Sequence, residues 1–372
     1  MLKTVVLLEN LKNGASFAHH AISSRNPLPV LLNFLIEAKD GNLYISATDL
    51  EIGIRVKIPA RVEGEGETTV PAKTFMDLVS SISVEKVELE EKPSVLELRG
   101  DKVKTSFPIL SAGEFPKLYE EKGQKQADFV KKDFIKNIGR VVFAAATDVG
   151  RPALSGVMIK KDEKDLGVTL VSTDGYRLSL EQEANIAKTQ GGPLSLLIPA
   201  RIIREVLGLK DSDQNIELFT FEKSNQVLFE NGDVTIVGRL IEAEYPNYQK
   251  IIPEEFSTKA VFSREEAQNA VRVCSVFARE AANIVKMGIG KEGIKFSANT
   301  ASVGDNEVEI EAKVEGEENE IAFNARYLLD LFANVDDELI IFQMTGPLNP
   351  GVFKLESNKS YLHLIMPIRV QG

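Results

Sequence analysis

The sequence predicts an α+β protein of three homologous domains, each built from two strand–helix–strand–strand–strand half-units. Three observations predict this. Marker motifs recur at shifts of 125 to 130 residues, each third of the chain repeats the same order of strand-like and helix-like runs, and the chain has 372 residues. A single hydrophobic core stops growing near ~250–300 residues, so a chain of this length is expected to divide. The predicted domains are residues 1–125, 126–252 and 253–372.

Three short motifs carry the repeat. Each occurs in the first and second thirds, and the first and second also return weakly in the last third. They are Val70-Pro71-Ala72-Lys73 with Ile198-Pro199-Ala200-Arg201 and Phe323-Asn324-Ala325-Arg326, Ser46–Asp49 with Val171–Asp174 and Phe296–Asn299, and Glu114–Leu118 with Glu244–Tyr248. Because chance would have to place all of them at nearly one period, we interpret the chain as three copies of one unit.

The elements of the first third follow from the spacing of apolar residues. Lys3–Leu8 predicts a strand, and Leu11, Ala15 and Ala18 then recur at helical spacing. Further strands are expected at 30–37, 43–46 and 52–58, where Asp40-Gly41 is typical of a hairpin turn. The order then restarts, with a strand at 68–70, a helix at 72–82, and strands at 87–89, 95–99 and 103–107. Polar, proline-bearing connections at 116–126 and 246–253 separate the domains.

Composition excludes several classes of protein. One cysteine, Cys274, rules out an intramolecular disulfide framework and a cysteine-rich zinc site. Three histidines make a histidine-based metal site or catalytic triad improbable, and no stretch of about 18 apolar residues indicates a membrane span. We therefore expect a reduced, cytoplasmic protein with no metal, no organic cofactor and no membrane association.

No catalytic constellation is visible either. Asp49 and Asp174 occupy equivalent positions, but the third repeat has Asn299, which cannot act as a base. A shared role in capping a turn is favoured instead. Cys274 lies within the apolar stripe of a predicted helix, which is typical of an inert buried thiol. We therefore expect a protein that is not an enzyme.

Positive charge is distributed unevenly along the chain. The net charge is −11, yet the six predicted helix regions carry 15 basic and 8 acidic residues. These regions are 10–25, 72–83, 131–151, 200–210, 263–280 and 325–335. Solvated helix faces often carry lysine and arginine, so the excess on any one helix means little. Six helices on one side of a sheet would nevertheless form a basic surface on an acidic body.

Two helices define this surface more sharply. In the third helix, the apolar periodicity leaves Lys132, Lys136 and Arg140 on the exposed face. In the fifth helix, Ser263 with Glu266 is typical of a capping box. Its predicted outer face consists of Gln268, Arg272, Ser275 and Arg279.

At this point the sequence resembles a known family, the bacterial sliding DNA clamp, which is the beta subunit of DNA polymerase III. The resemblance covers the whole chain and is strongest at Thr173–Leu178, at Tyr245–Tyr248 with Ile251–Pro253, and at Met366–Arg369. It implies the DNA-clamp fold, with helices lining the inside of a head-to-tail homodimeric ring and sheets outside. It also implies a processivity factor that encircles double-stranded DNA without reading its sequence. Implied partners are the replicative polymerase subunit, the clamp loader and other proteins with a clamp-binding motif.

The resemblance also assigns residues. A pocket for partner peptides would involve Leu154, Thr173, Gly175, Tyr176, Arg177, Leu178, Pro246, Ile251, Met366, Pro367, Ile368 and Arg369. Family positions that contact DNA match Arg25, Lys73, Arg201 and Arg151, to which helix-face geometry adds Lys136, Arg140, Arg272 and Arg279. Phe107 and Ile109 fall on the last strand of the first domain, a predicted subunit edge.

Two other readings compete with the clamp. A clamp-fold interaction hub that is not loaded on DNA would use the peptide pocket alone. A repeat-built enzyme would need a catalytic role for Asp49 or Asp174.

Overall fold

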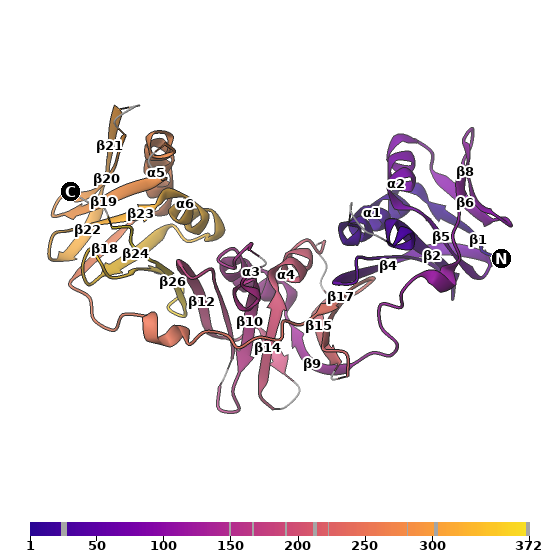
Figure 1. The fold of residues 1–372 in the computed structure, drawn as a ribbon, viewed down its shortest axis with the longest axis horizontal. Coiled ribbons are helices and arrows are strands. Elements are labelled where there is room, and N and C mark those ends of the chain that lie inside the picture. Colours follow the sequence, from indigo (N-terminus) through magenta and orange to yellow (C-terminus); the bar gives the residue numbers. More distant parts are fainter. Residues whose placement is uncertain are drawn as a thin grey trace. The chain divides into compact units, whose positions relative to one another are not determined.

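Six β-α-β-β-β half-units follow one another along the chain (Figure 1), as the periodicity predicts. The computed structural model describes residues 1–23, 28–148, 150–165, 167–189, 192–210, 214–221, 223–280, 282–300 and 304–369. The first two half-units are β1 (Lys3–Leu7), α1 (Leu8–Ala18), β2 (Asn33–Lys39), β3 (Asn42–Thr48) and β4 (Ile52–Gly64), then β5 (Gly66–Pro71), α2 (Ala72–Ser81), β6 (Lys86–Glu91), β7 (Val95–Arg99) and β8 (Lys104–Pro108).

The next four half-units repeat this order with two additional strands. The third and fourth are β9 (Gln124–Phe129), α3 (Lys131–Val142), β10 (Gly156–Lys161), β11 (Val168–Thr173), β12 (Arg177–Ala184) and β13 (Ala187–Thr189), then β14 (Leu194–Pro199), α4 (Ala200–Leu207), β15 (Ile216–Phe221), β16 (Gln226–Asn231) and β17 (Val234–Arg239). The fifth and sixth are β18 (Thr258–Ser263), α5 (Arg264–Ala278), β19 (Ile284–Gly290), β20 (Gly293–Thr300), β21 (Gly304–Ile310) and β22 (Ala312–Gly316), then β23 (Asn319–Asn324), α6 (Ala325–Asn334), β24 (Leu339–Met344), β25 (Gly351–Leu355) and β26 (Tyr361–Ile365).

Two strand boundaries differ most from the sequence prediction. The strand expected from residue 30 starts at Asn33, because Pro29–Leu32 form a 3-10 turn, which proline at the first position favours. The strand expected to end at residue 58 continues to Gly64 as β4. β4 pairs with β3 and β17 through its first half and with β1 through its end, so it joins neighbouring parts of one sheet.

The chain forms two compact units, described here separately. The first contains residues 1–131, 188–191 and 204–240, and the second contains 132–187, 192–203 and 241–372. The first unit holds a sheet with the path β13-β9-β15-β16-β17-β4-β1-β6-β7-β8, from which β2, β3 and β5 branch. The second holds a sheet in the order β14-β10-β11-β12-β26-β25-β24-β18-β22 and a smaller one in the order β21-β20-β19-β23.

Each unit has a continuous sheet because strands of successive predicted domains pair edge to edge. We call the antiparallel pairing of β4 with β17 the first seam, and that of β12 with β26 the second seam. Their registers correspond: Ile52 lies opposite Gly238 in the first seam, and Arg177 lies opposite Ile365 in the second. The seams therefore repeat one geometry twice within the chain.

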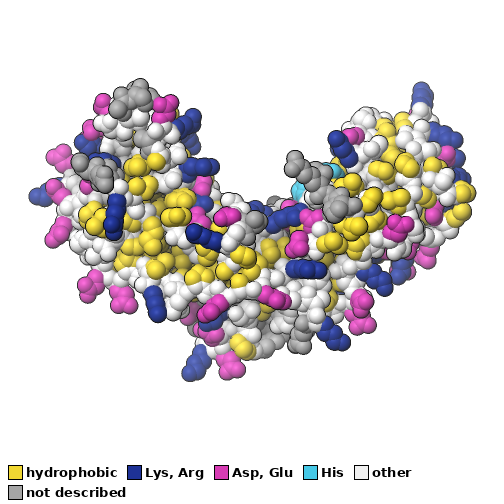
Figure 2. Space-filling view, in the orientation of Figure 1, with side chains coloured by type: hydrophobic (Ala, Val, Ile, Leu, Met, Phe, Trp, Pro, Cys, Tyr) yellow, Lys and Arg dark blue, Asp and Glu magenta, His cyan; other side chains and the backbone are white. Residues whose placement is uncertain are grey.

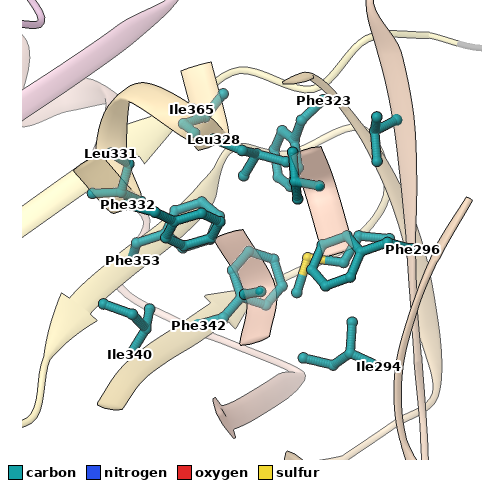
Figure 3. Packing of buried hydrophobic residues seen from close by; sticks show 14 of the residues in the cluster. Ile294, Phe296, Phe323, Leu328, Leu331, Phe332, Ile340, Phe342, Phe353 and Ile365 are labelled. Carbon is teal, nitrogen blue, oxygen red and sulfur yellow. The ribbon is translucent and has the colours of Figure 1, made fainter. Parts of the chain in front are cut away.

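The packing of the last two half-units shows how a helix pair is held on its sheets. α5 and α6 bury an apolar stripe against aromatic residues of the strands beneath (Figure 3). Phe332 of α6 stands edge-on to Phe262 of β18 and to Phe353 of β25, at 6.4 Å between ring centroids in each pair. Aromatic rings prefer edge-on contacts of this kind, so these pairs help to hold α6 on the strands. Among the described residues, no helix is both long enough and apolar enough to cross a membrane.

Candidate partner surface and nucleic-acid interface

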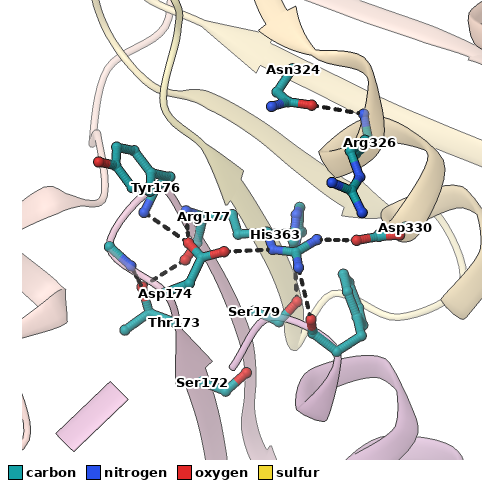
Figure 4. Close-up of polar contacts among 12 residues, drawn as sticks. Ser172, Thr173, Asp174, Tyr176, Arg177, Ser179, Asn324, Arg326, Asp330 and His363 are labelled. Atoms are coloured by element: carbon teal, nitrogen blue, oxygen red, sulfur yellow. Dashed lines mark hydrogen bonds and ion pairs between the residues drawn. The ribbon is translucent and has the colours of Figure 1, made fainter. Parts of the chain in front are cut away.

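The turn between β11 and β12 displays the residues with the strongest family signature (Figure 4). The Thr173 hydroxyl donates to the Arg177 carbonyl oxygen at 2.6 Å and accepts from the Gly175 N–H at 3.0 Å. The Asp174 carboxylate accepts from the backbone N–H groups of Tyr176 and Arg177 at 2.9 and 3.0 Å. Gly175 has φ +91°, a value that side chains disfavour. These four hydrogen bonds define the turn, and glycine adopts its positive φ without steric cost.

Arg177 fixes this turn to its surroundings. Its guanidinium donates to Asp174 at 3.0 Å, to Asp330 of α6 at 2.6 Å and to the Phe143 carbonyl oxygen at 3.0 Å. It also stacks over the Tyr327 ring at 4.7 Å from the centroid. The side chain is largely buried and its charge is paired. It therefore connects β12 to α6 and is not available as a surface cation.

The face of the second seam that lies away from α3, which we call its outer face, is apolar. Leu178 pairs with Leu364 and Leu180 with Leu362 across the strands. Together with Val171 they form a cluster that partly buried side chains cover, namely Met158, Tyr245, Tyr248, Ile252 and Met366. Figure 2 shows hydrophobic side chains gathered around β12 and β26 on the face that it displays. The predicted pocket residues Leu178 of β12 and Met366 of the C-terminal segment thus lie in one apolar cluster with Tyr245, Tyr248 and Ile252, which the sequence prediction did not include. We call this cluster and its rim the outer seam surface.

The C-terminal segment is hydrogen-bonded alongside this surface. The Met366 N–H donates to the Tyr176 carbonyl oxygen at 2.8 Å, and the Ile368 N–H donates to the Ala322 carbonyl oxygen at 2.8 Å. Met366, Pro367 and Ile368 are half-buried, and Arg369 is exposed. Leu154, on the 3-10 turn Pro152–Leu154, is also half-buried.

The rim of the outer seam surface leaves large apolar groups in solvent. Tyr176 is 58% exposed and Ile251 is 38% exposed, and Pro246, five positions before Ile251, is also exposed. Arg151 is exposed, and its guanidinium would lie 3.5 Å from a Cβ added at Gly175. Arg151, which the sequence prediction assigned to DNA, therefore lies close to Gly175, a residue of the predicted pocket. Adaptable and aromatic side chains around an apolar floor suit the docking of a linear peptide.

The inner face of the second seam is polar and buried, which sequence reasoning missed. His363 has no exposed surface, its Nδ1 lies 2.6 Å from the Ser179 hydroxyl, and Phe143 stacks on its ring. Burial lowers the pKa of His363 well below its usual value. Tyr361 donates to the carbonyl oxygen of Arg140 in α3 at 3.3 Å. The sequence does contain a sign of this. Apolar Leu178 and Leu180 alternate with polar Ser179 and Glu181 along β12, which indicates one apolar and one polar face.

Most predicted DNA-contacting cations are exposed on helices or their ends. Lys73 lies on α2, Lys136 on α3, Arg201 on α4, and Arg272 and Arg279 on and just after α5. Lys136 forms an ion pair with Asp336 at 3.0 Å, and Arg272 donates to Asn269 at 3.2 Å. Arg25 lies outside the described residues. Within the helix bounds, basic residues outnumber acidic ones by 11 to 7, a smaller excess than the wider predicted regions gave.

The prediction that Arg140 is exposed was wrong. Arg140 is only 4% exposed, and its guanidinium donates to Asp336 and, at 3.0 Å, to Asp337. The 3.6-residue period placed it next to Lys136 on the outer face, but acidic residues after α6 draw it inward. A buried, doubly paired arginine has no free charge for a phosphate, so Arg140 is a structural residue.

β8 is an edge strand, as predicted, but one of the two side chains predicted to lie in the subunit interface is buried. Among the described residues, β8 pairs only with β7 and ends its sheet. Phe107 is 2% exposed and packs on Phe75 at 5.4 Å between centroids, so its side chain belongs to the core. Ile109, one residue beyond β8, is half-buried.

α5 presents apolar side chains that the sequence analysis missed. Val273 and Val276 are 46% and 56% exposed, whereas Ser275, predicted to face outward, is buried. β21, an edge strand of the smaller sheet, lies against α5 and, within the part of the chain that the structure describes, pairs only with β20. The signal was the pair of valines flanking Ser275, which interrupts an otherwise polar helix face.

No metal or redox chemistry is assembled among the described residues. They contain no cluster of three or more histidine, cysteine, aspartate or glutamate side chains able to hold a metal ion. Burial raises the pKa of the Cys274 thiol to about 11, and the thiol donates to Asn306 at 3.1 Å. A thiol with this pKa is protonated and unreactive at neutral pH.

Matches to known protein families cover nearly the whole chain. Three family models match in succession: the DNA polymerase III beta subunit N-terminal domain at residues 2–119, its central domain at 129–247 and its C-terminal domain at 249–369. Proteins named Beta sliding clamp from Synechococcus elongatus and Staphylococcus epidermidis are 28% and 29% identical to it, over 100% and 94% of each chain.

Solved structures agree with these matches. The DNA polymerase III beta subunit of Thermotoga maritima superposes with a TM-score of 0.89 at 28% identity. The DNA polymerase sliding clamp of Bacillus subtilis superposes with a TM-score of 0.91 at 27% identity. Each match covers 100% of both chains.

Proposed function

The chain belongs to the family of the DNA polymerase III beta subunit, the bacterial sliding clamps, and we propose how its residues carry out that role. As a member of the family it is a sliding DNA clamp, a processivity factor without catalytic activity. The observation that carries this conclusion is the succession of three family-matched segments over six equal half-units. We place the domains at residues 1–125, 126–252 and 253–372, and the protein in the cytoplasm.

The proposed DNA contact is electrostatic and independent of sequence. Lys73, Lys136, Arg201, Arg272 and Arg279 lie exposed on helices or helix ends, and Arg25 is proposed with them. Cations that meet phosphates without reaching base edges hold the duplex but allow it to move. Release of the DNA is then limited by opening of the ring rather than by the strength of these contacts.

The proposed ring is a head-to-tail homodimer in which β8 of one copy meets β21 of the other. Both end their sheets among the described residues, and an edge strand favours pairing with another strand. Their charges are complementary, because β8 begins with Lys104 whereas β21 carries Asp305, Glu307 and Glu309. Val273, Val276 and Ile109 supply apolar area beside these strands.

The outer seam surface is the proposed docking site for linear peptides of the replicative polymerase, the clamp loader and other clamp-binding proteins. Leu178 and Leu364 form an apolar floor, and Tyr176, Ile251 and Met366 form an adaptable rim. A polymerase tethered there gains a high local concentration at the primer end.

One experiment tests the proposal as a whole. The protein is loaded by a clamp loader onto nicked circular DNA and followed by gel filtration, with the same DNA linearised as the control. We expect retention on the circle and loss from the linear form. Loss from both at equal rates would contradict the encircling role and leave a peptide-binding hub.

A further inference from the structure

The two seams differ in one respect that points to a second peptide site. In the turn before the first seam, Thr48 donates to the Ile52 carbonyl oxygen at 2.8 Å and accepts from the Leu50 N–H at 3.0 Å. Asp49 accepts from the N–H groups of Glu51 and Ile52. These are the contacts that Thr173 and Asp174 make before the second seam. Leu50 even keeps a φ of +79° at the position of Gly175.

The equivalence extends across the strands. The Arg239 N–H donates to the Glu51 carbonyl oxygen at 3.2 Å, as the Met366 N–H donates to that of Tyr176. Gly53 lies opposite Val237, as Leu178 lies opposite Leu364. The first seam therefore has the backbone framework of the outer seam surface.

At the first seam the equivalent surface is covered by the chain itself. Gly53 lacks the side chain that Leu178 provides, and a Cβ added there would lie 2.6 Å from Leu118 Cδ2. Leu118 and Tyr119, from the connection after β8, pack on Phe219, Leu228 and Val237. The Tyr119 and Phe221 rings lie 6.3 Å apart. A leucine followed by an aromatic residue thus covers the first seam at the place that corresponds to the outer seam surface.

We propose that the first seam is a peptide-binding site, occupied in this chain by its own segment Phe115–Tyr119. Its ligand class is a linear peptide with a leucine over Gly53 followed by an aromatic residue against Phe221. Withdrawal of Leu118 from the seam opens the site to such a peptide from another molecule. The proposal uses the outer seam surface as a template only and does not depend on DNA binding.

The test uses a tryptophan reporter, because the chain contains no tryptophan. Glu51→Trp places the reporter in an exposed turn of the first seam, and Tyr176→Trp does so at the second. The probe is a free, dansyl-labelled peptide with the sequence of residues 113–121. Energy transfer from the tryptophan of Glu51→Trp to the dansyl group reports binding of the probe at the first seam. In the Glu51→Trp background, we expect Leu118→Ala to bind the probe at least about tenfold more tightly than the chain with Leu118 does. A probe carrying alanine in place of its leucine should lose this binding.

Two further variants separate an opened site from general loosening. Gly53→Ala, added to Leu118→Ala, refills the vacated space and should abolish the binding. Val79→Ala removes a buried side chain of α2 that lies outside both clusters containing Leu118, and it should not create the binding. If Leu118→Ala does not fold by circular dichroism, Tyr119→Ala replaces it and should give a smaller gain. A folded variant that gains no binding at the first reporter, or Val79→Ala matching it, would overturn the proposal. DNA retention by the parent chain tests the clamp function separately.

Discussion

Arg140 shows how the setting of a single residue outweighs its place in a periodic pattern. Together with Asp337, which is equally buried, it forms a charged pair between α3 and the segment after α6. Two charges removed from water are tolerable only when each satisfies the other. The same Asp336 that pairs with Arg140 also pairs with exposed Lys136, so one cluster contains a structural cation and a surface cation.

This difference predicts unequal costs of mutation. Arg140→Ala leaves the Asp337 carboxylate buried without its partner, so we expect a loss of about 3–5 kcal/mol in the free energy of unfolding. Lys136→Ala, which breaks an exposed pair with Asp336, should cost less than about 1 kcal/mol. Urea unfolding of both variants checks this. Equal losses would show that the burial of Arg140 contributes nothing.

His363 predicts a pH dependence of stability. Burial lowers its pKa in the folded state, so below the unfolded value near 6.5 the unfolded chain binds a proton that the folded chain does not. The free energy of unfolding should therefore decrease as the pH is lowered from 6.5 to the folded-state pKa, by about 1.4 kcal/mol per pH unit. His363→Gln cannot titrate and should lose this part of the slope. Urea unfolding of both proteins at pH 7.5 and 5.5 isolates the effect, and parallel slopes would contradict it.

At the scale of elements, the sequence predicted the order of strands and helices well. It predicted less well which side chains of each element are buried and which are exposed. Periodicity and repeat spacing correctly gave all six half-units, because each buries a strip of apolar residues at a period of two or 3.6. It misplaced Arg140, Phe107 and Ser275, whose surroundings come from segments distant in sequence. It also gave no sign of the first seam, because Gly53 matters only through Leu118, 65 positions away.

Two elements, α5 and β21, carry a prediction about assembly. Val273→Glu with Val276→Glu places charges in the proposed apolar contact beside β21, so association should weaken by at least about tenfold. Light scattering at micromolar concentration should give about twice 41.0 kDa for the parent chain and a monomer for the variant. Val130→Glu, on an exposed valine between β9 and α3, is the matched control and should remain dimeric. A variant that stays dimeric would exclude this edge.

At the scale of the whole molecule, the helices carry the charge that attracts DNA, whereas the rest of the chain carries the charge that repels it. The chain as a whole has a net charge of −11, so random contact with a duplex is unfavourable. The helices nevertheless carry more basic than acidic residues, so attraction is confined to one class of element. In the proposed ring, closure around the duplex retains the protein on DNA, and the cations of the helices determine how its contact with phosphates depends on salt.

The final prediction follows from that division. Replacing Lys73, Lys136, Arg201 and Arg272 with glutamine should weaken direct binding to short duplexes and reduce the salt slope by about 0.9 for each lost phosphate contact. Replacing Lys39, Lys291, Lys313 and Lys359, which lie on strands and loops, changes the net charge equally and should leave the slope unchanged. Fluorescence anisotropy across a salt series measures both. Because closure holds the ring on DNA, the first variant, once loaded, should still remain on a circle longer than on a linear duplex. Equal effects of the two charge sets would mean that overall charge, rather than the helices, governs contact with DNA.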